Sequence, residues 1–201
     1  AEQTGTGTAL VPEVVNILFR ITEDRPVAIG MVILRGNTYT RDSVIQRELE
    51  PKTGEPYNYE SILQSQQRVY RYGYFGQARF EPVHPTEKTY RKDMLFTVEE
   101  RPAGAVEFGV GYGDLDLLRG FVEVSHRNLW GTARYASTRW EGSDILQRAA
   151  LTYQEPWFLG HRLDSQFSLV WSDRKNINQD TRKVTYQTRK TSAAWGVEKT
   201  S

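Results

Sequence analysis

Two hydrophobic patterns follow one another along the chain and meet at Pro102. Before this residue, apolar positions switch between a period of about two, typical of strands, and a period of about 3.6, typical of helices. After it, no helical period is found, and apolar and polar residues simply alternate. The pattern therefore predicts a small α+β unit followed by an all-β segment.

The first unit is predicted to contain a strand, two helices and two further strands, with both helices on one face of the sheet. The opening run, 27–34, is apolar at nearly every position, which predicts a strand that is apolar on both faces. Thr40 is placed to cap a short helix, and Asn58 to cap a second helix over 59–72 that stops at Gly73. The other predicted features are the apolar positions Val44, Ile45 and Leu49 of the first helix and the strands 75–83 and 94–99.

An internal echo indicates a domain repeat. Residues 18–26 read LFRITEDRP and residues 95–102 read LFTVEERP, so each is an alternating segment that ends in acid, acid, Arg, Pro. A proline cannot donate to a sheet ladder and therefore marks the end of a strand. We interpret 1–25 as the tail and last strand of an upstream copy and 26–102 as one whole unit. Chance similarity between two short strands is the alternative.

The second part, 103–201, reads as about six alternating segments of the length, ~9–11 residues, that a tilted membrane strand needs. The first of them includes 106–112 and the last covers 184–200. The predicted turns between segments lie at 114–118, 128–131, 142–144, 156–160 and 176–180.

Alternation alone fits either a membrane β-barrel or a soluble β-sandwich that buries one face. Two features favour the first strands of a barrel. Trp130, Trp157 and Phe158 lie at predicted turns, where an interfacial aromatic girdle belongs. We also expect short turns at one end of the strands and longer polar loops at the other.

Composition excludes several classes of function. The chain has 26 Lys and Arg against 25 Asp and Glu, so it has no electrostatic footprint for nucleic acid. It has no Cys, which excludes disulfides, thiol catalysis and Cys-ligated zinc. His84, His126 and His161 are scattered without metal-ligand spacing, and Asp114 with Asp116 suits a turn better than a cation site. We therefore predict no metal, no cofactor and no enzymatic activity.

Taken in order, several short motifs resemble those of the BamA/TamA-like outer-membrane assembly family. The resemblance implies that 26–102 is a periplasmic POTRA domain and that 103–201 is the opening part of an outer-membrane β-barrel. The matching segments are VILRGNT at 32–38, GEPY at 54–57, YGYF at 72–75, GVGYG at 109–113, NLWGT at 128–132 and YQEPWF at 153–158.

In that family the first barrel strand pairs weakly with the last, and this seam opens to client strands. Glycine weakens strand order, so we expect valine at Gly109 and Gly111 to impair client insertion. Arg119-Gly120-Phe121 spells a tripeptide that the family carries in a late barrel loop, but here it opens the second strand, so no function is carried over. The candidate client-pairing residues are Val106, Phe108, Gly109, Val110, Gly111, Tyr112 and Gly113.

The function implied by the resemblance is insertion of β-barrel client proteins into the bacterial outer membrane by β-augmentation, through the POTRA sheet edge and the first barrel strand. The implied partners are unfolded outer-membrane β-barrel precursors, outer-membrane lipid and accessory lipoproteins, with no nucleic acid. The POTRA part is expected in the periplasm. Two alternatives stay open: a two-partner secretion transporter that exports a polypeptide, and a soluble periplasmic binding or scaffold protein. A barrel fragment, unlike a soluble scaffold, should need detergent when 103–201 is isolated.

Overall fold

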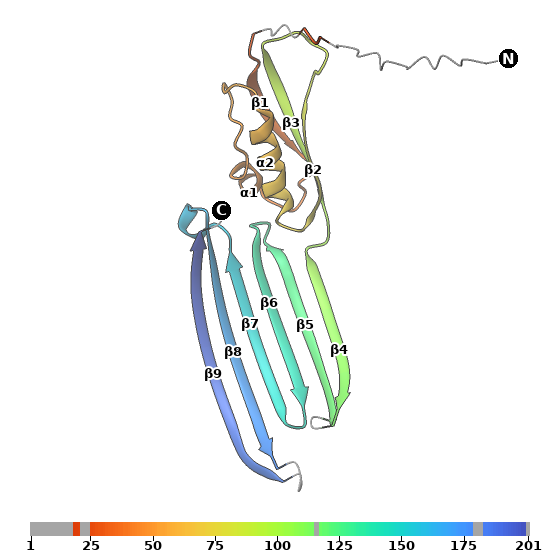
Figure 1. Cartoon of the computed structure of the whole chain (residues 1–201), viewed down its shortest axis with the longest axis vertical. Helices are drawn as coiled ribbons and strands as arrows, with labels where there is room; N and C mark the ends of the chain where they lie inside the picture. Colours follow the sequence, from red (N-terminus) through yellow and green to blue (C-terminus); the bar gives the residue numbers. More distant parts are fainter. Residues whose placement is uncertain (1–17, 21–24, 115–116, 179–182, 200–201) are drawn as a thin grey trace, which may run out of the picture.

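The computed structural model describes residues 18–20, 25–114, 117–178 and 183–199, which form an α+β domain stacked on the end of a six-stranded sheet (Figure 1). Within these residues, no helix is long and apolar enough to cross a membrane. The interpretation of 1–25 as part of an upstream copy falls almost entirely outside the described residues. The elements of the domain are β1 Ala28–Arg35, α1 Asp42–Gln46, α2 Tyr59–Tyr70, β2 Phe75–Pro82 and β3 Arg91–Glu100.

The domain has the predicted order of strand, helix, helix, strand, strand. β3 is the central strand, parallel to β1 and antiparallel to β2. Both helices lie on one face of this sheet (Figure 1). Their apolar stripes and the inward residues of the strands make one core, whose most deeply buried members include Ile29, Ile45, Val69, Met94 and Phe96.

The first strand is apolar on both faces, as predicted, but only one of the two faces is buried. Met31 is 59% exposed and Ile33 is 38% exposed, because no element among the described residues covers the sheet face opposite the helices. β1 is also an edge strand, and its outer edge is partly covered by the loop before α2. In that loop the Glu55 carbonyl accepts from the Ile29 N–H at 2.8 Å, and the Tyr57 N–H donates to the Val27 carbonyl at 2.7 Å.

Of the two predicted N-terminal helix caps, one is present in the structure and the other is not. The Asn58 side chain accepts a hydrogen bond from the Glu60 N–H at 2.9 Å, so the predicted cap of α2 is confirmed. The predicted cap at Thr40 is wrong, since α1 begins after Arg41, which makes no side-chain capping bond. The Thr40 hydroxyl instead accepts from the side-chain amide of Asn128, in the six-stranded sheet, at 2.8 Å.

The loop between β1 and α1 is organised by Glu100 at the end of β3. Its carboxylate accepts from the Thr38 N–H and hydroxyl at 3.0 and 2.8 Å, the Tyr39 N–H at 2.9 Å and the Thr40 N–H at 2.7 Å. Burial raises the pKa of Glu100, but the hydrogen bonds from this loop outweigh it and lower the pKa to about 2. The ionised carboxylate therefore stabilises the loop that meets the second sheet.

The second sheet is antiparallel throughout, with its strands in chain order from β4 to β9. The predicted strands are confirmed, but the two ends of the sheet do not divide into short turns and long loops. The ends of β6 and β7 that are joined by 144–145, and the ends of β8 and β9, which are separated by six residues in the sequence, all lie away from the α+β domain. The predicted turns 114–118 and 176–180 lie partly outside the described residues. The strands are β4 Gly104–Gly113, β5 Leu117–Leu129, β6 Arg134–Ser143, β7 Leu146–Glu155, β8 Leu163–Ile177 and β9 Val184–Lys199, with a short 3-10 helix, Phe158–Gly160, between β7 and β8.

The β5–β6 turn is fitted into the α+β domain. Asn128, at 1% exposure, donates to Thr40 and accepts from the Ala133 N–H at 2.8 Å. The Arg41 N–H donates to the Gly131 carbonyl at 3.0 Å. Gly131 has φ +70°, and a Cβ there would overlap the carbonyl oxygen of Tyr39. Only glycine therefore fits at this point of the junction.

The lowered pKa of Glu100 gives a stability prediction with a definite sign. Its folded pKa of about 2 lies below its ordinary value of 4.5, so its contribution to stability is complete above about pH 4.5 and is lost as the pH falls toward 2. Glu100→Gln should lower the thermal midpoint of the α+β domain at neutral pH. The gap between the variant and the parent chain should close at about pH 2, as followed by near-ultraviolet circular dichroism; a gap of constant size would contradict the assignment.

The junction gives a second prediction, with a matched control. Gly131→Ala should undock the turn, and amide exchange at Arg41 should rise by about tenfold, the factor that ~1.4 kcal/mol produces. Gly160→Ala is the control, since Gly160 has a similar φ of +75° but nothing within 4 Å of an added Cβ. Both variants carry the cost of a left-handed alanine. An equal rise at Arg41 in the two variants would show that overlap with Tyr39 is not the cause.

Candidate functional site at the free edge of the sheet

β4 is an edge strand of the six-stranded sheet. It pairs with β5 in an uninterrupted ladder from Gly104 opposite His126 to Gly113 opposite Leu117. Within the described residues its other edge has no partner strand, and β9 is the opposite edge. Such an edge presents backbone N–H and C=O groups that can template another strand. All the candidate client-pairing residues lie on this strand; their pairing with a client stays a prediction.

The outward face of β4 is apolar and fully open. Phe108 is 82% exposed and Val110 is 85% exposed. A soluble sandwich would cover such a face, whereas a membrane strand turns it to lipid. The same face continues across the sheet through other exposed apolar side chains: Val122, Val124, Trp140, Leu151, Phe167, Leu169, Trp195 and Val197.

The predicted aromatic girdle is only partly correct. Trp130 is 67% exposed at its turn, and Phe158 packs edge-on against Trp195 with ring centroids 6.0 Å apart. Trp157 is half-buried, and its indole N–H donates to the Glu48 carboxylate of the α+β domain at 2.7 Å. The prediction placed Trp157 at the membrane interface because it lies in a turn. In the structure, its side chain instead contacts the α+β domain.

The inner face of β4 carries the three glycines, and their neighbours on β5 lie across them. Gly109 is opposite Phe121, and an added Cβ would lie 2.5 Å from the Phe121 ring. Gly111 is opposite Arg119, whose Nε would lie 3.4 Å from an added Cβ. Gly113 has nothing within 4 Å. Gly109 and Gly111 thus leave room for side chains of β5. The sequence pattern of a single strand could not predict this, because it depends on how β4 and β5 are paired.

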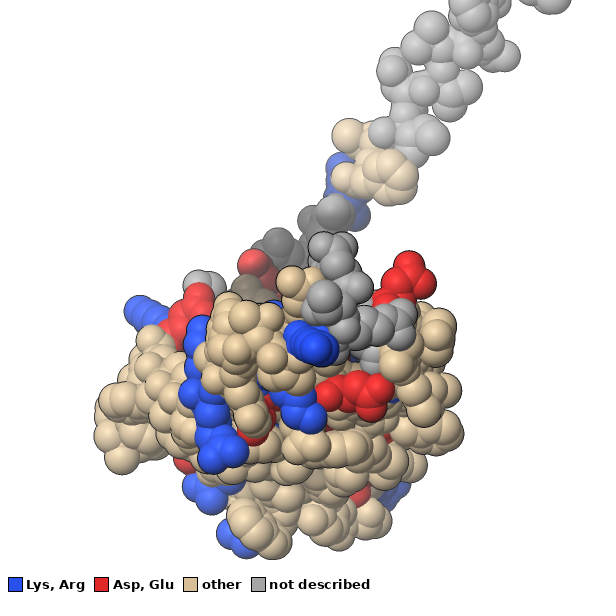
Figure 2. Space-filling view, turned by 90° about the horizontal axis from the view of Figure 1, so that it is seen from below, with Lys and Arg blue, Asp and Glu red and all other residues tan. Residues whose placement is uncertain are grey.

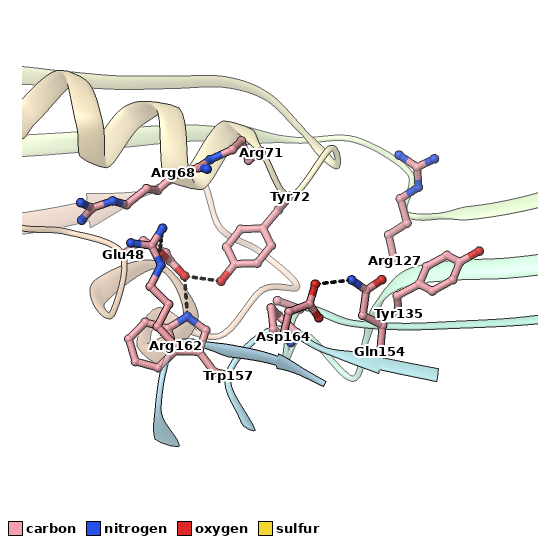
Figure 3. Close-up of a pocket in the computed structure, with 12 residues that line it drawn as sticks. Glu48, Arg68, Arg71, Tyr72, Arg127, Tyr135, Gln154, Trp157, Arg162 and Asp164 are labelled. Atoms are coloured by element: carbon pink, nitrogen blue, oxygen red, sulfur yellow. Dashed lines mark hydrogen bonds and ion pairs between the residues drawn. The ribbon is translucent and has the colours of Figure 1, made fainter. Parts of the chain in front are cut away.

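A cavity of about 420 Å³ lies where the α+β domain meets the inner face of the sheet (Figure 3). Glu48, at 4% exposure, accepts there from the Tyr72 hydroxyl at 2.5 Å and from Trp157. Burial and the neighbouring Glu48 carboxylate raise the pKa of Tyr72, so its hydroxyl stays a donor. The guanidinium of Arg47 lies 5.1 Å from the Trp157 ring centroid. Tyr72 and Trp157 both donate to Glu48 across this cavity, so we assign the cavity to the joint between the domain and the sheet.

Two of the three histidines make local polar contacts. His126 Nδ1 accepts from the Asn128 N–H at 3.1 Å, and His161 lies beside the carbonyl of Leu159. Among the residues that the structure describes, no cluster of His, Asp or Glu could hold a metal ion; Asp116 lies outside them. Basic and acidic side chains are intermingled on the molecule viewed from the far end of the sheet (Figure 2).

Comparison with known proteins agrees with this arrangement. The family model described as POTRA, surface antigen variable number repeat, matches residues 27–101. The outer membrane protein assembly factor BamA of Neisseria meningitidis serogroup B is 28% identical over 144 residues, covering 72% of this chain and 18% of that protein. The BamA of Nitratidesulfovibrio vulgaris is 33% identical over 124 residues, covering 62% of this chain and 16% of that protein.

A solved structure, BamA from Haemophilus ducreyi lacking POTRA domains 1–3, superimposes with a TM-score of 0.68 at 20% identity, covering 85% of this chain and 31% of that one. This likeness shows the fold. The chain spans only 16–18% of the two BamA relatives. From the POTRA match, the two relatives and the shared fold, the chain carries a POTRA domain and is similar to the BamA/TamA-like outer-membrane assembly family over that domain and the strands that follow it.

Proposed function

We propose that the protein inserts β-barrel client proteins into the outer membrane by β-augmentation at β4. The free edge of β4 carries this proposal. A client strand that pairs there continues the backbone ladder, and its outward side chains extend the apolar face beside Phe108 and Val110 into lipid. Backbone pairing needs little sequence specificity, which suits a protein that handles many precursors. The assembly-factor names of the relatives support the same function, and no enzymatic step is required.

The POTRA sheet offers a second edge for client segments, and we assign this role to β2. The edge of β1 is partly covered by the loop at 54–57, which exchanges backbone hydrogen bonds with Val27 and Ile29. β2 pairs with β3 on one side, and within the described residues no strand pairs with its other side. An extended segment therefore meets fewer obstacles at β2 than at β1.

We also propose the division of the chain into 1–25 as the tail and last strand of an upstream POTRA domain, 26–102 as a POTRA domain and 103–201 as the first strands of the barrel. The match over 27–101 and the start of β4 at Gly104 support the two later boundaries. Outer-membrane lipid and accessory lipoproteins are the further partners we propose. No observation favours polypeptide export over insertion, and the exposed apolar face argues against a soluble scaffold.

The role of the β4 edge can be tested by replacing glycines of β4 with valine, which favours an ordered strand. Gly111→Val with Gly113→Val meets little steric conflict, since Gly113 is open and Gly111 has only a contact at 3.4 Å. Gly109 is left unchanged because a side chain there would displace the Phe121 ring. In the full-length protein, client insertion into proteoliposomes should fall by about fivefold, since the strand propensity scale spans ~1 kcal/mol.

The matched control for this prediction is Gly196→Val in β9. Gly196 is also a strand glycine with nothing within 4 Å of an added Cβ, but it lies on the opposite edge strand. Insertion should stay at the parent rate in the control. Unchanged insertion in the β4 double variant would remove the β4 edge from the proposed mechanism.

A further inference from the structure

Two side chains of β5 reach over β4 toward its free edge. Phe121 and Arg119 alternate along β5 and share the inner face of the sheet, directly opposite Gly109 and Gly111. The tip of the Phe121 ring occupies the space of a Gly109 Cβ, and the Arg119 side chain runs past Gly111 with its Cγ at 3.7 Å and Nε at 3.4 Å from an added Cβ. Because β4 has no inward side chains at these positions, the two β5 residues become the neighbours of any strand that pairs with β4.

The two arginines near these residues differ, because one of them forms an ion pair and the other does not. Arg139 lies 3.9 Å over the Phe121 ring and forms an ion pair with Glu123 at 3.1 Å. Arg119 forms no ion pair with any carboxylate of the described residues. It lines a pocket of about 280 Å³ together with Gly109, Gly111, Phe121, Arg139 and Glu141. The pocket beside the free edge of β4 thus holds an aromatic ring that contacts Arg139 and a guanidinium that forms no ion pair within the described residues.

We propose that Arg119 and Phe121 select the strand that pairs with β4, favouring a client segment with a carboxylate on its inward face beside Gly111. Opposite charges on one face of neighbouring strands attract, and a guanidinium can hold a carboxylate through two parallel hydrogen bonds. The glycine at position 111 removes the side chain that would otherwise separate the two groups. This inference rests on the proposed pairing of clients with β4 and adds to it a preference in sequence.

The test measures strand pairing directly, on the whole chain in detergent micelles. The chain has no Cys, so Val110→Cys places a single thiol on the outward face of β4. Ten-residue peptides with alternating apolar residues carry one outward Cys and, in turn, Glu, Gln or Lys at each inward position. Disulfide yield reports pairing at β4 and not at β9. At one inward position we expect Glu to exceed Gln by about threefold and Lys to give the lowest yield.

Charge reversal separates selection from a general structural role. Arg119→Glu should invert the order, so that the Lys peptide pairs best. The control is Arg148→Glu, which reverses an exposed cation on the inner face of β7, opposite Glu141 and away from the edge. The control should keep the preference for Glu, and Arg119→Lys should retain most of it.

The possible outcomes distinguish a failure of the proposed strand selection from a failure of client pairing at β4. Equal yields for Glu, Gln and Lys at every inward position would overturn the selection by Arg119 while leaving β4 as the pairing edge. An inverted order in both Arg119→Glu and Arg148→Glu would also overturn it, since the preference would then follow net charge. If no peptide forms a disulfide with Cys at position 110, client pairing at β4 is itself contradicted, and the selection with it.

Discussion

The structure depends on one constraint: a strand surrounded by hydrocarbon must have its backbone hydrogen bonds satisfied. An unpaired N–H or C=O in lipid costs several kcal/mol, about as much as any side-chain contact can return. The apolar outer face of β4 places this strand in lipid, and its outer edge has no partner within the described residues. A strand that pairs with this edge would satisfy the backbone groups of β4.

The POTRA domain is held where this strand begins. The segment that joins β3 to β4 is bonded on both sides, through the Arg101 N–H to the Tyr74 carbonyl at 2.8 Å and through the Ala103 carbonyl to the Arg127 N–H at 2.9 Å. Glu100 shapes the loop that receives Asn128, and Glu48 receives Trp157 from the next turn. Because these buried polar groups satisfy one another, separation of the domain would leave several unpaired at once. The start of β4 is thus positioned by the domain as well as by β5.

The three glycines of β4 have different surroundings, which their presence in the sequence alone does not predict. As a sequence feature they predict a loosely ordered strand. In the sheet each has its own surroundings: Phe121 covers Gly109, Arg119 passes Gly111, and Gly113 is open. Covering a strand glycine with an aromatic ring from the neighbouring strand is a known way to support it. Only Gly113, at the end of β4 away from the POTRA domain, has open space beside it, and the other two positions accommodate side chains from β5.

The sequence by itself determined the local features: the change of period at Pro102, the alternating strands and most of the turns, and the Asn58 cap of α2. Each depends on residues a few positions apart, so local propensity and periodicity suffice. The tertiary structure alone decided the rest. Thr40 bonds Asn128, 88 residues away, instead of capping α1, and Trp157 bonds Glu48, 109 residues away, instead of facing the membrane interface. The placing of Arg119 and Phe121 over β4 likewise required strand register. Contacts between distant segments are set by packing and register, which leave no periodic trace in the chain.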